Sequence, residues 1–69
     1  MSLSYRKLWK LLIDRNISKA ELRKLTGLAP NTMTKLNRND EVTLRVLMKI
    51  CDVLNVDIGD IVEFIKDKT

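Results

Sequence analysis

The chain has 69 residues, of which 45% are hydrophobic and 32% are charged, and its net charge is +4. This size allows one small domain spanning residues 1–69, and the balance of apolar and charged residues is globular rather than disordered. Because there is no histidine and Cys51 is the single cysteine, neither an internal disulfide nor a metal ligand set is available. We therefore expect no metal, no cofactor, and a thin core that favours self-association.

No apolar run approaches the roughly 20 residues that span a bilayer. Lys10 interrupts the apolar residues near the N-terminus, and Asp14 and Arg15 follow them without a small-residue cleavage site, which excludes a signal peptide. We expect no membrane partner and a cytoplasmic location, which the single thiol also fits.

The charges are distributed unevenly. Residues 1–39 carry nine basic and two acidic residues, a net charge of +7, whereas residues 40–69 carry four basic and seven acidic residues, a net charge of −3. A polyanionic partner on one side would explain this separation. A basic face that is only solvated explains it equally well, so charge alone does not decide between them.

Apolar residues recur with helical spacing almost throughout, which predicts an all-α fold of five helices. The first helix, near residues 4–15, is expected to be capped by Ser4 and ended by Asn16 in a left-handed conformation. Its apolar stripe consists of Tyr5, Leu8, Trp9, Leu12 and Ile13. Trp9 lies within this stripe, so a place in the core is favoured over base stacking.

The second helix has the clearest start signal. Ser18 and Glu21 form a capping box, in which each side chain accepts a hydrogen bond from the other residue's backbone amide. Leu22, Leu25 and Thr26 are expected to share one face of this helix. Gly27 then ends it, because a residue without Cβ can adopt positive φ.

The third helix follows after the short connection Gly27-Leu28-Ala29. Pro30 suits its first position and holds the preceding residue outside helical geometry. Met33 and Leu36 are expected to point inward, and the helix ends near residues 37–39.

The remaining elements follow a polar turn. Thr43 caps a fourth helix with an inner stripe of Leu44, Leu47, Met48, Cys51 and Leu54. Asp57 caps a short fifth helix that carries Ile58, Ile61 and Val62. The tail, about residues 63–69, fits either a helix or a terminal strand that could pair with its copy in a second subunit.

Two short helices joined by a glycine turn follow the helix-turn-helix plan, with Leu28 tucked between them. Helical hairpins with such turns also occur in structural bundles. The order of all the elements therefore carries more weight than the turn alone.

A resemblance to a known family rests on residues 18–36, SKAELRKLTGLAPNTMTKL. This stretch is similar to the lambda-repressor/Cro-like (XRE-type) helix-turn-helix domains of bacterial and phage transcription regulators. Residues 43–61 match the closing pair of helices, and residues 9–15 resemble a compact subgroup made of this domain alone. The resemblance implies a five-helix lambda-repressor-like DNA-binding domain with its helix-turn-helix at about residues 18–37.

The chain departs from the family pattern at four positions. Arg23 stands where relatives keep a small residue at the helix crossing, and Lys19 replaces a common glutamine. Ala29 replaces a Ser or Thr cap, and Asn39 replaces a glycine whose geometry Asn tolerates. The base preference of relatives therefore cannot be transferred to this chain.

By position, the resemblance places the third helix in the major groove of double-stranded DNA. The expected base contacts are its outward residues, with Asn31 suited to adenine, Lys35 to guanine and Thr34 to a thymine methyl: Pro30, Asn31, Thr34 and Lys35. The expected phosphate contacts are Lys19, Thr32, Arg38, Lys7 and Lys10. For each residue taken singly, ordinary solvated polarity is the alternative interpretation.

These expectations combine into a sequence-specific DNA-binding transcriptional regulator, with repression favoured by family analogy alone. One such domain binds weakly, so we expect a homodimer on a palindromic site with half-sites about 34 Å apart. Phe64 and Ile65 are the expected dimer contact, although they could simply cover the first helix.

Other functions are weighed against this one. A protein-interaction module on the same scaffold, such as an antitoxin or an anti-regulator, would show little DNA affinity, and a nonspecific architectural binder would hold all duplexes equally. No catalytic set, phosphate loop or small-molecule site is evident. Cys51 has no basic partner to activate it, and Asp57 and Asp60 stand where acids favour a helix start, so we expect no enzyme.

Overall fold

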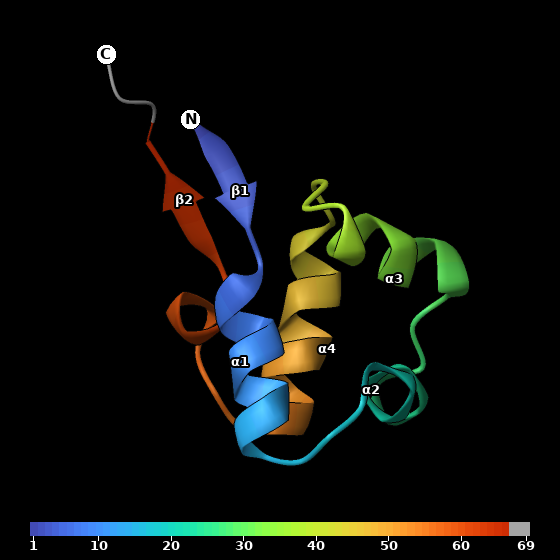
Figure 1. Ribbon diagram of the computed structural model, residues 1–69. Coiled ribbons are helices and arrows are strands. Elements are labelled where there is room, and N and C mark those ends of the chain that lie inside the picture. Colours follow the sequence, from blue (N-terminus) through green and yellow to red (C-terminus); the bar gives the residue numbers. More distant parts are fainter. Residues whose placement is uncertain (67–69) are drawn as a thin grey trace.

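The computed structural model describes residues 1–66. Its elements, in chain order, are β1 (Ser2–Ser4), α1 (Arg6–Asp14), α2 (Lys19–Thr26), α3 (Pro30–Asn37), α4 (Leu44–Leu54), the 3₁₀ turn η1 (Ile58–Asp60) and β2 (Glu63–Ile65). α1 and α4 occupy the centre, α2 and α3 lie on one flank, and the two strands project from the opposite end (Figure 1). Within this range no helix has both the length and the apolar character needed to cross a bilayer.

The fold is mostly helical, but the prediction of five helices is wrong: residues 1–66 contain four α-helices and a small two-stranded sheet. The segment expected to form the fifth helix makes only the single turn η1. Asp57 still caps this turn, since its carboxylate accepts a hydrogen bond from the Ile58 amide at 2.7 Å. The turn stops where Ile61 enters the core, because the chain then extends into β2.

The start of the first helix is also corrected. α1 begins at Arg6 rather than near residue 4, and Tyr5 occupies the cap position without a side-chain cap. The hydroxyl of Ser4 accepts a hydrogen bond from the Arg6 amide at 3.1 Å, but Ser4 itself belongs to β1. Sequence periodicity missed this strand because its pairing partner lies about sixty residues away in the chain.

The tail forms the strand alternative over Glu63–Ile65, but its partner is β1 of the same chain. The antiparallel register pairs Ser2 with Ile65, Leu3 with Phe64 and Ser4 with Glu63. An ion pair of 2.9 Å between Arg6 and Glu63 joins α1 to this sheet. Residues 67–69 of the predicted tail lie outside the described residues.

The predicted caps of α2 and α4 are confirmed. The Ser18 hydroxyl accepts from the Glu21 amide at 3.0 Å, and the Glu21 carboxylate accepts from the Ser18 amide at 3.4 Å. Gly27 has a φ of +69°, and the Thr43 hydroxyl accepts from the Val46 amide at 3.3 Å. Left-handed asparagines follow three elements, with φ near +58°, +58° and +55°: Asn16, Asn39 and Asn55. Local chemistry therefore sets most of the helix boundaries.

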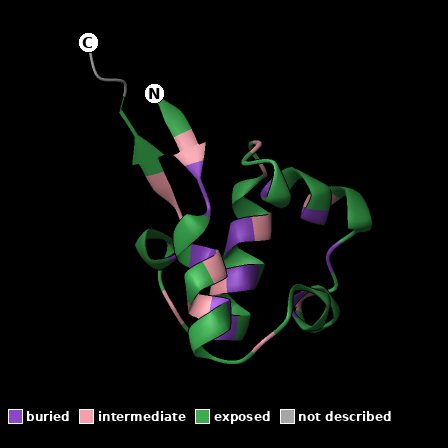
Figure 2. Ribbon diagram, viewed as in Figure 1, coloured by how far each residue is buried: buried purple, intermediate pink, exposed green. Residues whose placement is uncertain are grey.

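The core is formed by the facing sides of α1 and α4 together with residues of the helix-turn-helix (Figure 2). Its members are Tyr5, Leu8, Leu12, Leu22, Leu28, Met33, Leu36, Leu47, Ile50, Leu54 and Ile61. Trp9 packs against this core as a half-buried residue, as its place in the stripe predicts.

Four residues predicted to face inward are exposed instead: Ile13, Leu25, Leu44 and Met48. The correction is clearest on α4, which carries apolar residues on two stripes. Leu47, Ile50 and Leu54 are buried, whereas Leu44 and Met48 are 62% and 64% exposed. Both stripes have helical spacing, so periodicity could not decide which one faces the core.

Tyr5 links the start of α1 to the loop that follows α3 through two hydrogen bonds. Its side chain is buried, and its hydroxyl donates a hydrogen bond of 2.7 Å to the carbonyl oxygen of Asp40. Its backbone amide donates to the Oδ1 atom of Asn39 at 3.1 Å. Chiefly because of burial, and also because of the charges of Asp40 and Glu41, the pKa of the Tyr5 hydroxyl is raised. The protonated tyrosine is thus a structural cross-link between distant parts of the chain.

We expect Tyr5→Phe to lower the free energy of unfolding by about 1 kcal/mol, because the partly buried Asp40 carbonyl loses its donor while the ring remains in place. For a domain of this size the melting temperature should fall by about 4–8 °C, measured by circular dichroism.

The difference in the free energy of unfolding between the original protein and Tyr5→Phe should shrink at high pH. A raised pKa means that the folded state holds the Tyr5 proton more tightly than the unfolded chain does. The resulting stability is fully present below a pH of about 10 and is lost as the pH rises through the folded pKa. Urea unfolding of both proteins between about pH 8 and pH 11 checks this, and a constant difference would contradict it.

Candidate nucleic-acid interface

The position of α3 is set by its inner face and by the turn before it. Leu28, in the turn, is buried, and so are Met33 and Leu36 on the helix. Ala29 adopts an extended conformation with no side-chain cap, and Pro30 takes the first helical position. Arg23 is exposed, so its side chain does not occupy the crossing of α2 and α3. The departures from the family pattern are therefore accommodated.

The outer face of α3 presents four of the residues selected from the sequence. Pro30, Asn31, Thr34 and Lys35 are all exposed. The Thr34 hydroxyl donates to the Pro30 carbonyl at 3.1 Å, which leaves its methyl group and oxygen lone pairs for other contacts. Within residues 1–66, the side chains of Asn31 and Lys35 have no hydrogen-bond or ion-pair partner. Both keep their full donor capacity for a ligand.

Lys19 joins three helices at one point. Its Nζ atom lies 2.8 Å from Oδ1 of Asn37, the last residue of α3, and 4.1 Å from the centre of the Trp9 ring on α1. A cation at the first position of a helix opposes the helix dipole, and these two contacts offset that cost. The ammonium is thereby held beside the C-terminal end of α3.

Sequence reasoning did not identify the contacts of the Lys19 ammonium with Asn37 and with the Trp9 ring. Asn37 reads as an ordinary helix-ending residue, and Trp9 reads as a member of an apolar stripe. The contact depends on how α1, α2 and α3 are placed in space, so no spacing in the sequence signals it.

Thr32 and Arg38 lie at opposite ends of the same helix region. Thr32 is half-buried. The Arg38 side chain is 71% exposed, and its Nε atom lies 3.5 Å from the carboxylate of Asp40. An exposed ion pair of this length contributes little to stability, so it leaves Arg38 free to exchange partners.

Lys7 and Lys10 lie elsewhere. The Nζ atom of Lys7 donates to the carbonyl oxygen of Gly59 in η1 at 3.1 Å. Lys10 lines a shallow hollow between α1 and η1, together with Asp14 and Asp60. The structure therefore groups Lys19 and Arg38 with α3, and it groups Lys7 and Lys10 with an acidic neighbourhood beside η1.

Phe64 and Ile65 lie on β2, away from α3. Phe64 is 67% exposed and Ile65 is also exposed, so neither serves mainly to cover α1. They form an accessible apolar edge of the molecule.

The Cys51 thiol lies near the carboxylates of Asp57 and Asp60. Burial raises the pKa of the Cys51 thiol, and the charges of Asp57 and Asp60 raise it further, so the thiol stays protonated near neutral pH. In the part of the chain that the structure describes, no three Cys, Asp or Glu side chains gather as a metal site.

Comparison with known proteins matches residues 7–67 to the family model of the Cro/C1-type helix-turn-helix DNA-binding domain. The chain belongs to this family. Among solved structures it is similar to a protein described as the transcriptional regulator VanUg, with 53% sequence identity and a TM-score of 0.88 over 90% of this chain and 83% of that one. No significant match was found among curated protein sequences.

Membership in this family indicates which surface of the domain is relevant to DNA binding, namely the exposed face of α3. The family is one of DNA-binding domains, and helix-turn-helix domains place their second motif helix in the major groove. The helix-turn-helix motif and the general DNA-binding role predicted from the sequence are thus confirmed, and the individual contact residues remain predictions.

The contact between Lys19 and Trp9 can be tested without DNA. We expect a double-mutant cycle of Lys19→Met and Trp9→Leu to give a coupling of about 0.5–1 kcal/mol in urea unfolding. The cycle is needed because Lys19→Met also relieves an unfavourable interaction with the helix dipole. The same cycle with Lys24→Met, on the same helix, serves as the control. If both cycles are additive, the contact contributes nothing.

Proposed function

We propose that this protein is a sequence-specific regulator of transcription that binds double-stranded DNA and acts mainly as a repressor, by occupying a site near a promoter. One observation carries the proposal: α3 buries Met33 and Leu36 and leaves its opposite face bare. A bare helix face in this motif has the width that the major groove admits. Binding to DNA also implies that the protein resides in the compartment that holds the DNA.

Bases are read by the exposed residues of α3. The Asn31 amide can pair bidentately with adenine, and the Lys35 ammonium can donate to guanine. Neither has a protein partner to give up within residues 1–66. Thr34 can add contact with a thymine methyl, and Pro30 packs at the entry of the helix.

Phosphates are bound at the end of α3 where the cations gather. Lys19 is held in place there, and Arg38 follows the same end of the helix. Thr32, in the first turn of α3, completes the proposed set. The placement of Lys7 and Lys10 beside η1 argues against including them. Phosphate contacts fix the register of the helix in the groove and carry no sequence information of their own.

Two copies of the domain would bind a palindromic site, with their α3 helices about 34 Å apart. A single domain buries about 600–1,000 Å² of protein surface on DNA, which gives weak binding alone. Two exposed apolar surfaces are available to join the copies: the edge formed by Phe64 and Ile65 on β2, and the outer stripe of α4.

Selection of bound duplexes from random DNA tests the proposal directly. A palindrome supports specific reading by a dimer, and a single short motif supports a monomer. The absence of any enrichment would refute specific reading and favour a protein-interaction module or a nonspecific binder instead.

Substitutions then separate base contacts from phosphate contacts. We expect Asn31→Ala to lose about 1–3 kcal/mol of affinity for the selected duplex and to change binding to random DNA little. Fluorescence anisotropy on the two duplexes measures the difference. An equal loss of affinity for both duplexes would show that Asn31 makes no base-specific contact.

Lys19→Ala should weaken both duplexes alike, because it removes a phosphate contact. For roughly six neutralised phosphates the log–log salt slope is near −5, and this variant should reduce its magnitude by about 1 for each copy of the domain on the duplex. Lys10→Ala, the matched lysine beside η1, should leave the slope unchanged. If Lys10→Ala reduced the slope and Lys19→Ala did not, the phosphate contacts would lie on α1 instead.

A further inference from the structure

Lys19 and Asn37 bring two polar side chains together where the start of α2 meets the end of α3. Both residues are exposed, and the Nζ atom of Lys19 lies 2.8 Å from the Oδ1 atom of Asn37. An ammonium has donors and no acceptor, so the oxygen of the Asn37 amide must face it. The nitrogen of that amide is then directed away from Lys19. The charge of one side chain thus fixes the orientation of the other.

Most of the donors of this pair are not used inside the domain. Within residues 1–66 the Nδ2 atom of Asn37 makes no hydrogen bond, and the Lys19 ammonium makes one hydrogen bond and no ion pair. Two N–H groups of Asn37 and two of Lys19 are therefore left for a ligand. Several donors around one positive charge suit an anion that accepts more than one hydrogen bond, such as a phosphodiester.

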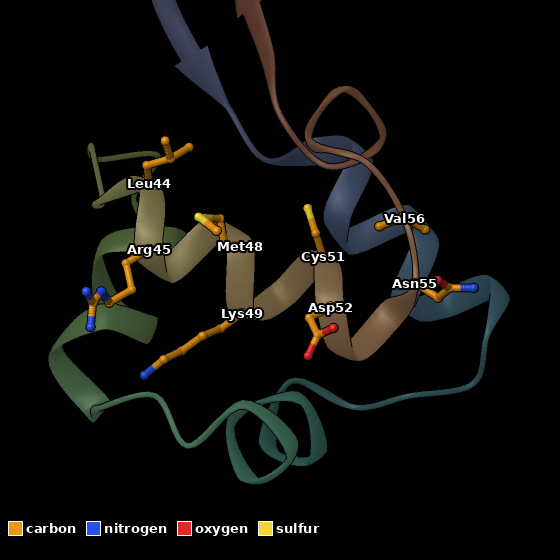
Figure 3. A pocket seen from close by; sticks show the side chains of 8 residues that line it. All are labelled: Leu44, Arg45, Met48, Lys49, Cys51, Asp52, Asn55 and Val56. Atoms are coloured by element: carbon orange, nitrogen blue, oxygen red, sulfur yellow. The ribbon is translucent and has the colours of Figure 1, made fainter.

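Lys19 differs from an ordinary solvated lysine because it is already held in place. Lys49 on α4 is exposed, has no partner within residues 1–66, and extends with its ammonium directed away from Asp52 (Figure 3). A lysine of that kind loses side-chain freedom when it binds a phosphate. Lys19 has lost part of this freedom already, through its contacts with Asn37 and with the Trp9 ring at 4.1 Å. The pair of Lys19 and Asn37 is therefore a preformed group of donors.

The position of Asn37 on α3 determines what its amide can reach. Asn37 is the last residue of α3 and follows Thr34 by three positions, so the two side chains are neighbours on the helix surface. Its contact with Lys19 places it on the side of α3 that adjoins the start of α2. When α3 lies in the major groove, side chains in the middle of its outer face meet base edges. A group at the margin of that face meets the sugar-phosphate backbone instead.

We propose that the Lys19 ammonium and the Asn37 amide bind one phosphate of the DNA backbone together. Lys19 supplies the positive charge and donates to one phosphate oxygen, and the Nδ2 atom of Asn37 donates to another oxygen of the same phosphate. Because the two residues belong to α2 and α3, a single phosphate fixes both helices of the motif against the backbone. Asn37 is thus a DNA contact in addition to the proposed set of Lys19, Thr32 and Arg38.

This proposal rests on the proposed function for the presence of DNA beside α3, but the two fail in different ways. The shared phosphate reads no base, so the contact forms on random duplexes as well as on a selected one. Weaker binding of random DNA by Asn37→Ala, with no sequence preference in the original protein, would contradict the proposed function alone. Tight binding of a selected palindrome by Asn37→Ala would contradict the shared phosphate alone.

Two substitutions at Asn37 separate a direct contact from support of Lys19. We expect Asn37→Ala to weaken binding to selected and random duplexes by about tenfold for each copy of the domain, because a hydrogen bond to a charged group is lost. The salt slope should stay the same, since the amide carries no charge. Asn37→Asp keeps an acceptor for Lys19 and has no donor, so it should lose at least as much affinity. Full affinity in Asn37→Asp would show that Asn37 only holds Lys19 and would overturn the proposal.

Uncharged methylphosphonates, placed at one phosphate of the duplex at a time, identify the phosphate. Fluorescence anisotropy should find one position where the change weakens binding by the original protein at least about tenfold. At that position both Lys19→Ala and Asn37→Ala should lose at least about threefold less than the original protein, whereas Lys49→Ala should lose as much as it does. Circular dichroism checks that all variants are folded. Sensitivity of Lys19 and Asn37 to two different phosphates, or no change in the response of Asn37→Ala at any position, would overturn the proposal.

Discussion

The packing of Met33 and Leu36 is the interaction on which the rest of this structure depends. A helix of eight residues is not stable alone in water, so α3 exists because these two side chains are buried with Leu22 and Leu28. Truncating a buried Leu or Met typically costs about 2–5 kcal/mol, a large part of the roughly 5–15 kcal/mol that holds a domain together. Only one side of the helix serves this purpose. The same packing that fixes α3 therefore leaves its outer face available.

The loop that follows α3 is fixed by polar contacts. Tyr5 donates hydrogen bonds from its backbone to Asn39 and from its ring to Asp40, and it lies between β1 and α1. Through Tyr5, which directly follows β1, the small terminal sheet is thus linked to the loop that follows α3. A sheet of two three-residue strands is marginal by itself, so its pairing is stabilised by the residues that continue into the core, Tyr5 on one side and Ile61 on the other.

Local sequence chemistry predicted the boundaries of α2, α3 and α4, and three-dimensional arrangement decided the rest. The capping box at Ser18, the turn at Gly27 and the cap at Thr43 act within four residues, so they are readable from the sequence. The strand β1 was not readable, because its partner β2 is at the other end of the chain. The two apolar stripes of α4 were both visible, yet only packing shows that Ile50 is buried and Met48 is not. In the candidate interface the exposed residues of α3 followed from its inward pair, but the contact of Lys19 with Asn37 did not.

The proposed phosphate contacts and the proposed base contacts lie at different places around α3. The Lys19 ammonium has three donors and gives one to Asn37, so it can donate another to a phosphate oxygen while it stays over the Trp9 ring. Arg38 has five donors, and its long, exposed contact with Asp40 occupies few of them. Both therefore lie ready at one end of the helix, where backbone contacts would set its register. Asn31 and Lys35 lie along the exposed face of α3 and have no partner in residues 1–66. Once the phosphate contacts of Lys19 and Arg38 had positioned α3 in the groove, these two side chains would lie next to the base edges.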